Sequence, residues 1–251
     1  MQLNKHSNGL LSIYFTAGYP TLDSTVQIAK ALEEAGVDFL EIGFPYSDPV
    51  ADGPTIQHAS EEALKNGMSL KVLFEQLKDL RKHVSIPVYL MGYVNPVLQY
   101  GVENFCKACK DVGVNGTIIP DLPMYEYEEL YQTVFEENDI SNIFLVTPQT
   151  SEQRIRKIDD LSTNFIYLLS SNATTGKNLE VKDQAQAYFK SIKDMDLKNP
   201  FIIGFGISNQ ETFQKATTYA NGAIVGTAFV KLLAEGNYLE KIPDFIKSIK
   251  G

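Results

Sequence analysis

The stretch EEAGVDFLEIG (33–43) joins a helical pattern, through one glycine, to a short apolar strand. Glycine ends helices because it adopts positive φ without steric cost, so the pattern predicts a helix, a tight turn and a strand. The same order recurs in KDVGVNGTIIP (110–120) and TYANGAIVG (218–226). In SIPVYLMG (85–92) and NPFIIGFG (199–206), proline opens the strand without loss of a ladder hydrogen bond. The repeated unit of this chain is therefore helix, turn, strand.

The number of these units indicates the fold. Eight apolar strands are expected, at residues 11–16, 38–43, 87–92, 115–120, 142–147, 164–170, 201–206 and 222–226. Between them, segments such as 24–35, 69–83 and 209–220 carry apolar residues at three- and four-residue spacing, which is typical of amphipathic helices. Eight β/α units in 251 residues favour a (β/α)8 TIM barrel over an open doubly wound sheet. No linker or low-complexity segment divides the chain, so we expect one domain over residues 1–251.

The composition is that of a globular chain with an acidic balance. Hydrophobic residues make up 44% of the sequence, enough to bury a core. The net charge of −9 repels nucleic acid and anionic membranes, so neither is an expected partner. The first ten residues lack the apolar region of a signal peptide, and no apolar run approaches the ~20 residues of a membrane span. A cytoplasmic location is the resulting expectation.

In a barrel, catalytic residues lie at the C-terminal ends of strands, and the most informative end is EIGFPYSDPVADGPTIQ (41–57). Glu41 interrupts an apolar run and has the parity of Phe39 and Gly43, which indicates the barrel interior. Burial disfavours the charged carboxylate and raises its pKa, as a general acid near neutral pH requires. The alternative is a strand-end glutamate paired with a base, although no Lys or Arg occurs within 31–64.

Two aspartates, Asp48 and Asp52, follow in the same loop, whose conformations are limited by prolines at positions 45, 49 and 54. Alone, an ADG sequence is most often a turn whose carboxylate bonds its own backbone. Two carboxylates at the mouth of one barrel nevertheless suggest two proton-transfer roles. Spacing does not decide whether Asp48 or Asp52 takes the second one.

Glycines at the last strand ends suggest a phosphate site. GFGIS (204–208) and AIVGT (223–227) each place glycine where a strand gives way to a helix, and exposed N–H groups there bind anions. A single glycine of this kind is most often only a tight turn, but the pair on adjacent strands favours phosphate binding. The candidates are Gly206, Gly226 and Thr227, with Gly176 from the sixth loop.

Metal or redox chemistry has little support. The histidines at positions 6, 58 and 83 are scattered, and none lies at a strand end beside a carboxylate pair. Cys106 and Cys109 form a C-x-x-C within a helical pattern that lacks a second cysteine pair, so we expect two reduced, packed thiols. The residues therefore predict a barrel enzyme that acts on a small phosphate ester by acid–base chemistry.

The motifs FTAGYP, EIGFPYSDPVADGPTIQ, MGYVNP, PDLP, GFGIS and VGTAFV, in this order and at strand ends, make the chain resemble the tryptophan synthase α-subunit family from about residue 12 to about residue 232. The resemblance implies a carbon–carbon lyase of tryptophan biosynthesis. Its reaction is the retro-aldol cleavage of indole-3-glycerol phosphate to indole and glyceraldehyde 3-phosphate, and it implies no metal and no organic cofactor.

The resemblance also implies residue roles. Glu41 would move protons at indole C3 and at the substrate hydroxyl, and Asp52, not Asp48, would hydrogen-bond the indole N–H and stabilise positive charge on the ring. The implied substrate contacts are Tyr14, Tyr167, Thr175 and Phe205, and the implied phosphate contacts are Gly176, Gly206, Gly226 and Thr227. The sixth loop, SSNATTG, departs from the G-V-T-G ending of many members at Ala173 and Thr174.

The family implies a partner, a pyridoxal-phosphate β subunit that receives the indole in an α2β2 complex. Positions that match its docking surface are Pro45, Asp48 and Asn95. Three alternatives stay open on the sequence alone: a stand-alone indole-3-glycerol phosphate lyase, a catalytically quiet regulatory subunit, and another phosphate-binding barrel such as an isomerase of the same pathway.

Overall fold

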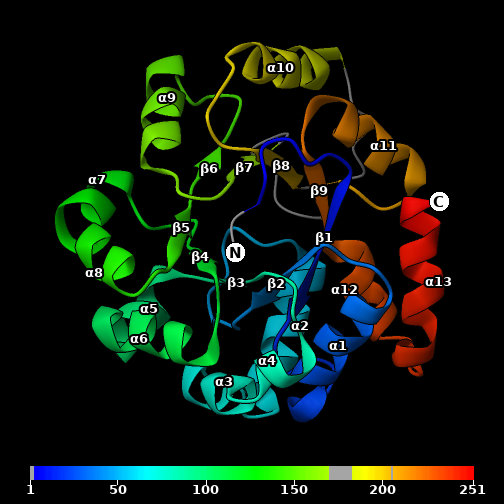
Figure 1. Ribbon diagram of the computed structural model, residues 1–251. Helices are drawn as coiled ribbons and strands as arrows, with labels where there is room; N and C mark the ends of the chain where they lie inside the picture. Colours follow the sequence, from blue (N-terminus) through cyan, green and yellow to red (C-terminus); the bar gives the residue numbers. More distant parts are fainter. Residues whose placement is uncertain (1–2, 170–182, 205) are drawn as a thin grey trace.

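The computed structural model describes residues 3–169, 183–204 and 206–251, and in that part of the chain all strands belong to one parallel sheet. The strands are β1 (Leu10–Thr16), β2 (Phe39–Gly43), β3 (Val88–Met91), β4 (Gly116–Ile118), β5 (Ser141–Ile143), β6 (Leu145–Val146), β7 (Ile166–Leu169), β8 (Phe201–Gly204) and β9 (Gly222–Val225). Their order in the sheet is β5-β4-β3-β2-β1-β9-β8-β7-β6. Because β5 and β6 are consecutive in the chain, the sheet closes into a barrel, and the helices surround it (Figure 1).

The fold class predicted from the sequence is confirmed, with one difference at the fifth strand. The strand expected at 142–147 is two short strands that meet at Phe144. β5 pairs only with β4, and β6 pairs only with β7, among the described strands. As the barrel curves, this segment changes partner at Phe144, whose carbonyl accepts a hydrogen bond of 2.9 Å from the N–H of Tyr167. The barrel therefore keeps eight strand positions although the described residues form nine strands.

The helices follow the strands in alternation, as the sequence pattern predicted. They are α1 (Thr25–Glu34), α2 (Pro54–Lys65), α3 (Leu70–Leu77), α4 (Leu80–His83), α5 (Val94–Tyr100), α6 (Val102–Val112), α7 (Met124–Glu126), α8 (Gln132–Glu137), α9 (Glu152–Leu161), α10 (Asp183–Asp194), α11 (Gln210–Tyr219), α12 (Thr227–Leu233) and α13 (Tyr238–Lys250). A 3₁₀ turn (Leu22–Ser24) precedes α1, and a π turn (Tyr127–Tyr131) joins α7 to α8. None of the helices in the described residues is long and apolar enough to cross a membrane.

Local capping explains several of these boundaries. Gly113 ends α6 in the left-handed region with φ of 79°, which glycine adopts without strain. Asn209 begins α11 with a reciprocal capping box, in which its side chain accepts from the N–H of Thr212. The helix expected at 69–83 is broken into α3 and α4, which are separated by Lys78 and Asp79.

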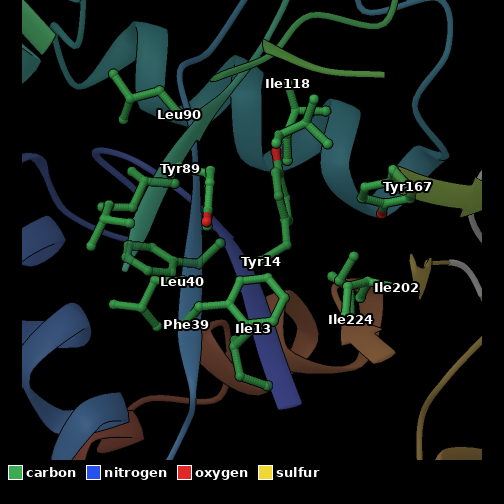
Figure 2. Packing of buried hydrophobic residues seen from close by; sticks show 14 of the residues in the cluster. Ile13, Tyr14, Phe39, Leu40, Tyr89, Leu90, Ile118, Tyr167, Ile202 and Ile224 are labelled. Carbon is green, nitrogen blue, oxygen red and sulfur yellow. The ribbon is translucent and has the colours of Figure 1, made fainter. Parts of the chain in front are cut away.

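The barrel interior is aromatic at its centre. Phe39, Tyr89 and Phe165 pack with ring centroids 5.1 to 5.9 Å apart. Figure 2 shows Phe39, Tyr89 and Tyr14 gathered inside the ring of strands. Tyr14 on β1 lies in register with Glu41 on β2, which lies in register with Tyr89 on β3. Residues in register on parallel strands share a face, so Glu41 belongs to an inward layer of aromatic side chains.

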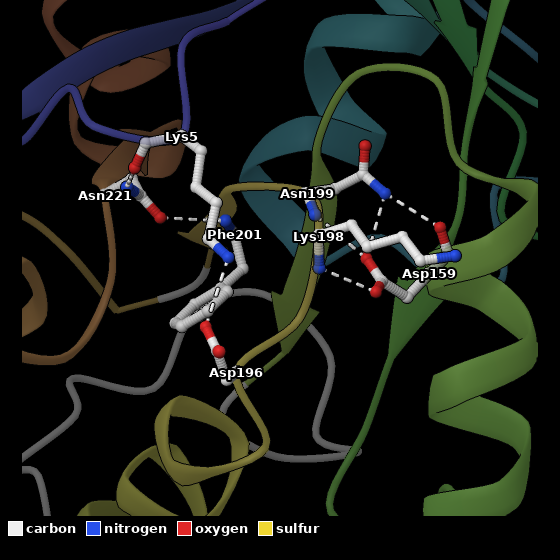
Figure 3. Close-up of polar contacts among 7 residues, drawn as sticks. All are labelled: Lys5, Asp159, Asp196, Lys198, Asn199, Phe201 and Asn221. Carbon is white, nitrogen blue, oxygen red and sulfur yellow. Dashed lines mark hydrogen bonds and ion pairs between the residues drawn. The ribbon is translucent and has the colours of Figure 1, made fainter.

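Hydrogen bonds from polar side chains hold the segment that leads into β8, at the N-terminal ends of the strands (Figure 3). The Asp159 carboxylate accepts hydrogen bonds from the N–H groups of Lys198 (2.7 Å) and Asn199 (3.0 Å). The Asn221 side chain accepts from the N–H of Phe201 at 3.1 Å and donates to the carbonyl of Lys5 at 2.7 Å. These contacts hold the end of the barrel opposite the predicted catalytic residues, where stability is the expected role.

Candidate active site

Glu41 is fully buried at the middle of β2, in register with Tyr14 and Tyr89 on the neighbouring strands. Neither of its carboxylate oxygens has a hydrogen-bond partner among the residues that the structure describes. Burial without a partner disfavours the ionised form and raises the pKa of Glu41 to about 8. The carboxyl is therefore protonated at neutral pH and can donate a proton, as the sequence predicted for a general acid.

A cavity of about 680 Å³ opens at the C-terminal ends of the strands, in the size range of a small-molecule site. Its walls include residues from several strand ends and loops: Tyr14, Phe44, Tyr46, Asp52, Met91, Tyr93, Leu145, Thr147, Arg154, Tyr167 and Leu169. The expected substrate contacts Tyr14 and Tyr167 are thus brought together with Asp52. Glu41 is not among the described lining residues, but its register neighbour Tyr14 lines the cavity.

Two glycines allow the rings of Tyr14 and Tyr167 to lie close to the strand backbone. A Cβ on Gly43 would overlap the hydroxyl of Tyr14, and a Cβ on Gly204 would overlap that of Tyr167. Close approach of a side chain to the backbone is one of the uses of glycine within strands. Burial raises the pKa of both tyrosines above the ordinary value, so both stay neutral and present hydroxyl groups beside the cavity.

Asp52 is half-buried in the loop between β2 and α2, and its carboxylate accepts a hydrogen bond of 3.2 Å from the Tyr93 hydroxyl. Its backbone carbonyl accepts a second bond, of 2.8 Å, from the Gln57 side chain. Burial raises the pKa of Asp52 to about 6, while the Tyr93 hydrogen bond opposes that rise. Asp52 is therefore mostly ionised at neutral pH, in contrast to Glu41.

The other expected positions in and near this loop differ from Asp52. Asp48 is exposed and accepts a hydrogen bond of 2.6 Å from Ser47, and it is not among the described residues that line the cavity. Asn95 is exposed at the start of α5 and donates to the Tyr46 hydroxyl at 3.3 Å. Pro45 is buried. Only Asp48 and Asn95 of the three predicted docking positions therefore present their side chains to solvent.

The expected phosphate residues follow two neighbouring strands. Gly206 has φ of 76° after β8, and Gly226 and Thr227 begin α12 directly after β9. A Cβ on Gly226 would lie 3.6 Å from the Cβ of Tyr14, so this turn is adjacent to a side chain that lines the cavity. The remaining expected positions, Thr175, Gly176 and Phe205, lie outside the described residues, as do Ala173 and Thr174.

The sequence did not single out Tyr93, Tyr46 or Arg154, all of which line the cavity. Tyr93 belongs to the strand-end motif MGYVNP, so its position was visible but its contact with Asp52 was not. Cys106 and Cys109 are buried with free thiols, and burial raises the pKa of Cys106 to about 12. No group of three or more His, Cys, Asp or Glu residues suited to a metal ion occurs in the described residues.

Comparison with known proteins agrees with this geometry. The sequence profile described as "Tryptophan synthase alpha chain" matches residues 1–246. This chain belongs to the tryptophan synthase alpha chain family. It is 57% identical over 240 residues to the tryptophan synthase alpha chain of Flavobacterium psychrophilum, with 96% of this chain and 94% of the relative covered. The alpha chain of Christiangramia forsetii is 55% identical, with 96% and 94% covered.

Solved structures give the same family. A tryptophan synthase complex from Pyrococcus furiosus matches with a TM-score of 0.88 and 36% identity, and covers 97% of this chain and 98% of the matched chain. Tryptophan synthase from Mycobacterium tuberculosis matches with a TM-score of 0.86 and 32% identity, and covers 97% and 91%. Alpha chains of this family are lyases that cleave indole-3-glycerol phosphate, so the fold, activity and family expected from the motifs are confirmed.

Proposed function

We propose that this chain cleaves indole-3-glycerol phosphate with Glu41 as the proton carrier and Asp52 as the group that holds the indole ring. The observation that supports this assignment is a pair of carboxyl groups with opposite protonation, one on β2 and one in the loop that follows it. Burial raises the pKa of Glu41 to about 8, whereas Asp52, with a pKa of about 6, stays mostly ionised. Two carboxyl groups whose environments separate their pKa values supply an acid and an anion at the same pH.

The chemistry needs both groups. Protonated Glu41 gives its proton to indole C3, and the resulting positive charge spreads to the ring nitrogen. The ring N–H donates a hydrogen bond to the Asp52 carboxylate, which stabilises that charge. Glu41, now ionised, takes the proton of the substrate hydroxyl as the carbon–carbon bond breaks. The products are indole and an aldehyde, and Glu41 ends protonated as it began. We assign the phosphate group to the turns of Gly206, Gly226 and Thr227, together with the expected contact at Gly176. Thr175 and Phe205 stay expected contacts of the rest of the substrate.

We also propose that a β subunit receives the indole. The matched Pyrococcus furiosus structure is described as a tryptophan synthase complex, which supports a partner for this chain as well. The exposed Asp48 lies in the same loop as Asp52, and the exposed Asn95 donates a hydrogen bond to Tyr46 of that loop, so a partner seated there would lie against the loop of Asp52. The α2β2 assembly and the cytoplasmic location stay predictions from the sequence, and a stand-alone lyase is the alternative that the partner experiment separates.

The test is indole release from indole-3-glycerol phosphate by the wild type, Glu41→Gln and Asp52→Asn, each alone and with a tryptophan synthase β subunit. The chain has no tryptophan, so indole fluorescence can be followed without that background. We expect each variant to lose at least about 100-fold in kcat, since proton transfer and charge stabilisation each contribute on that scale. Glu103→Gln and Asp111→Asn, on the exposed face of α6, are the matched controls.

Retention of activity by Glu41→Gln would exclude Glu41 as the proton carrier. Fast release that a β subunit leaves unchanged would favour the stand-alone lyase.

A further inference from the structure

One hydroxyl group bridges two successive residues of the β2–α2 loop. Tyr93 lies between β3 and α5, and its hydroxyl accepts a hydrogen bond of 3.0 Å from the N–H of Ala51. The same hydroxyl donates to Oδ2 of Asp52 at 3.2 Å. Tyr93 is only 6% exposed, so bulk water does not readily replace its hydroxyl in either contact. The end of the third strand thus holds the catalytic loop of the second.

Burial anchors little of the described chain just before Asp52. Val50 is 80% exposed and Ala51 is exposed, so neither anchors the segment by burial. Gln57 holds the backbone carbonyl of Asp52 at 2.8 Å, but it does not orient the carboxylate. Among the residues that the structure describes, Tyr93 is the one donor to that carboxylate. Orientation of the Asp52 side chain therefore depends on Tyr93.

The Tyr93 ring is itself held from its other side. Tyr46 packs against it with ring centroids 5.2 Å apart and an angle of 33° between the planes. The Tyr46 hydroxyl accepts from the Asn95 side chain at 3.3 Å. Both tyrosines line the cavity. The two rings, one from each neighbouring strand end, form a small stack that limits where the Tyr93 hydroxyl can point.

We propose that Tyr93 is a positioning residue for the lyase reaction: its hydroxyl fixes Asp52 with Oδ2 engaged and Oδ1 turned to receive the indole N–H. The inference rests on the proposed role of Asp52. A bound donor on one oxygen limits carboxylate rotation, and this leaves a single acceptor direction for the substrate. Tyr46 supports the arrangement by packing on the ring.

The charged and titratable groups around this contact come from several strands. The hydroxyls of Tyr14 on β1 and Tyr167 on β7 lie within the electrostatic influence of Asp52, and both also sense Glu41. Asp121, after β4, is near Tyr93 and accepts from the N–H of Val94 at 2.8 Å. Because the Tyr93 hydrogen bond lowers the pKa of Asp52, its removal lets burial raise that pKa further.

The experiment compares Tyr93→Phe with the wild type in steady-state indole release, at varied substrate concentration, across pH 5 to 9. A hydrogen bond to a charged group corresponds to about a 10- to 100-fold change in rate. We expect a loss of that size in kcat, a smaller change in KM, and a shift of the ascending limb of the pH profile to higher pH. Tyr100→Phe removes a hydroxyl from α5 that makes no hydrogen bond to a described residue, and it is the matched control.

A double-mutant cycle separates positioning from a general structural effect. If Tyr93 acts through Asp52, Tyr93→Phe costs little further in the Asp52→Asn background. An equal loss in both backgrounds, or a loss without a shift of the pH limb, would overturn the proposal. So would a Tyr93→Phe variant as active as the wild type. Full activity of Asp52→Asn alone would instead overturn the role proposed for Asp52, which keeps the two failures distinct.

Discussion

Replacement of Glu41 by glutamine is expected to stabilise the fold in a pH-dependent way. Burial raises the pKa of Glu41 from its ordinary value of 4.5 to about 8. Because the folded-state pKa lies above the unfolded one, the unfolded chain releases this proton first. Stability from the protonated carboxyl is complete below pH 4.5 and is lost as the pH rises toward about 8.

The size of this loss follows from the pKa shift. Each pKa unit corresponds to about 1.4 kcal/mol, so ionisation of Glu41 costs the folded state up to roughly 5 kcal/mol at alkaline pH. That is a large part of the roughly 5–15 kcal/mol that a domain of this kind has in total. Glutamine keeps the shape of the side chain and cannot ionise. The free energy of unfolding of Glu41→Gln minus that of the wild type should therefore rise across this interval and level off above it.

The assay is urea unfolding followed by circular dichroism at pH 5, 6, 7, 8 and 9. The difference between variant and wild type isolates position 41, since all other titrating groups are common to both proteins. Glu103→Gln is the matched control, because it removes the same charge from an exposed site on α6 without a burial cost. A difference that stays flat from pH 5 to 9 would refute the reasoning, since Glu41 would then ionise in place without penalty.

Two further predictions concern the walls of the cavity. Gly43→Ala should lower stability by about 1–3 kcal/mol and reduce activity, because its Cβ would displace the Tyr14 ring. The control is Gly226→Ala, whose Cβ would reach only ordinary contact with Tyr14 and should leave the urea midpoint nearly unchanged. Equal urea midpoints for the two variants would contradict this prediction. Arg154 makes no ion pair with a described residue and is the one cation among the described residues that line the cavity. Arg154→Gln should therefore lower kcat/KM for the anionic substrate several-fold at low salt and little at high salt. Arg156 is paired with Glu152 at 2.7 Å, and Arg156→Gln is the control; equal effects of the two variants would contradict a steering role for Arg154.

The sequence predicted the barrel because each helix-to-strand junction carries its own local signal. Gly113 ends α6 in the left-handed region as the pattern required. Strand pairing at closure has no such local signal. The predicted strand at 142–147 divides at Phe144 because it must pair with β4 on one side and β7 on the other, and that demand comes from the curvature of the whole barrel. The spacing of apolar residues along one segment cannot predict this change of pairing partner.

The candidate site also has features that the sequence could predict and features that it could not. Parity placed Glu41 inside the barrel, and the structure agrees, because alternation along a strand is a local property. Spacing alone could not choose between Asp48 and Asp52. That choice depends on which carboxylate the Tyr93 hydroxyl reaches from a neighbouring strand end, 41 residues away in sequence. Residues that act through such cross-strand contacts carry no motif of their own.

These contacts give the two carboxyl groups their separate states. Burial raises both pKa values, that of Glu41 to about 8 and that of Asp52 to about 6, so burial alone favours the neutral form of both groups. The proposed reaction requires one of each: a proton on Glu41 and a charge on Asp52. The difference arises because Glu41 is fully enclosed and has no hydrogen-bond partner in the described residues, whereas Asp52 is half-buried and accepts from Tyr93. Between about pH 6 and about pH 8 the two required states coexist. The Tyr93 hydroxyl widens that interval, because its hydrogen bond lowers the pKa of Asp52, which sets the lower limit.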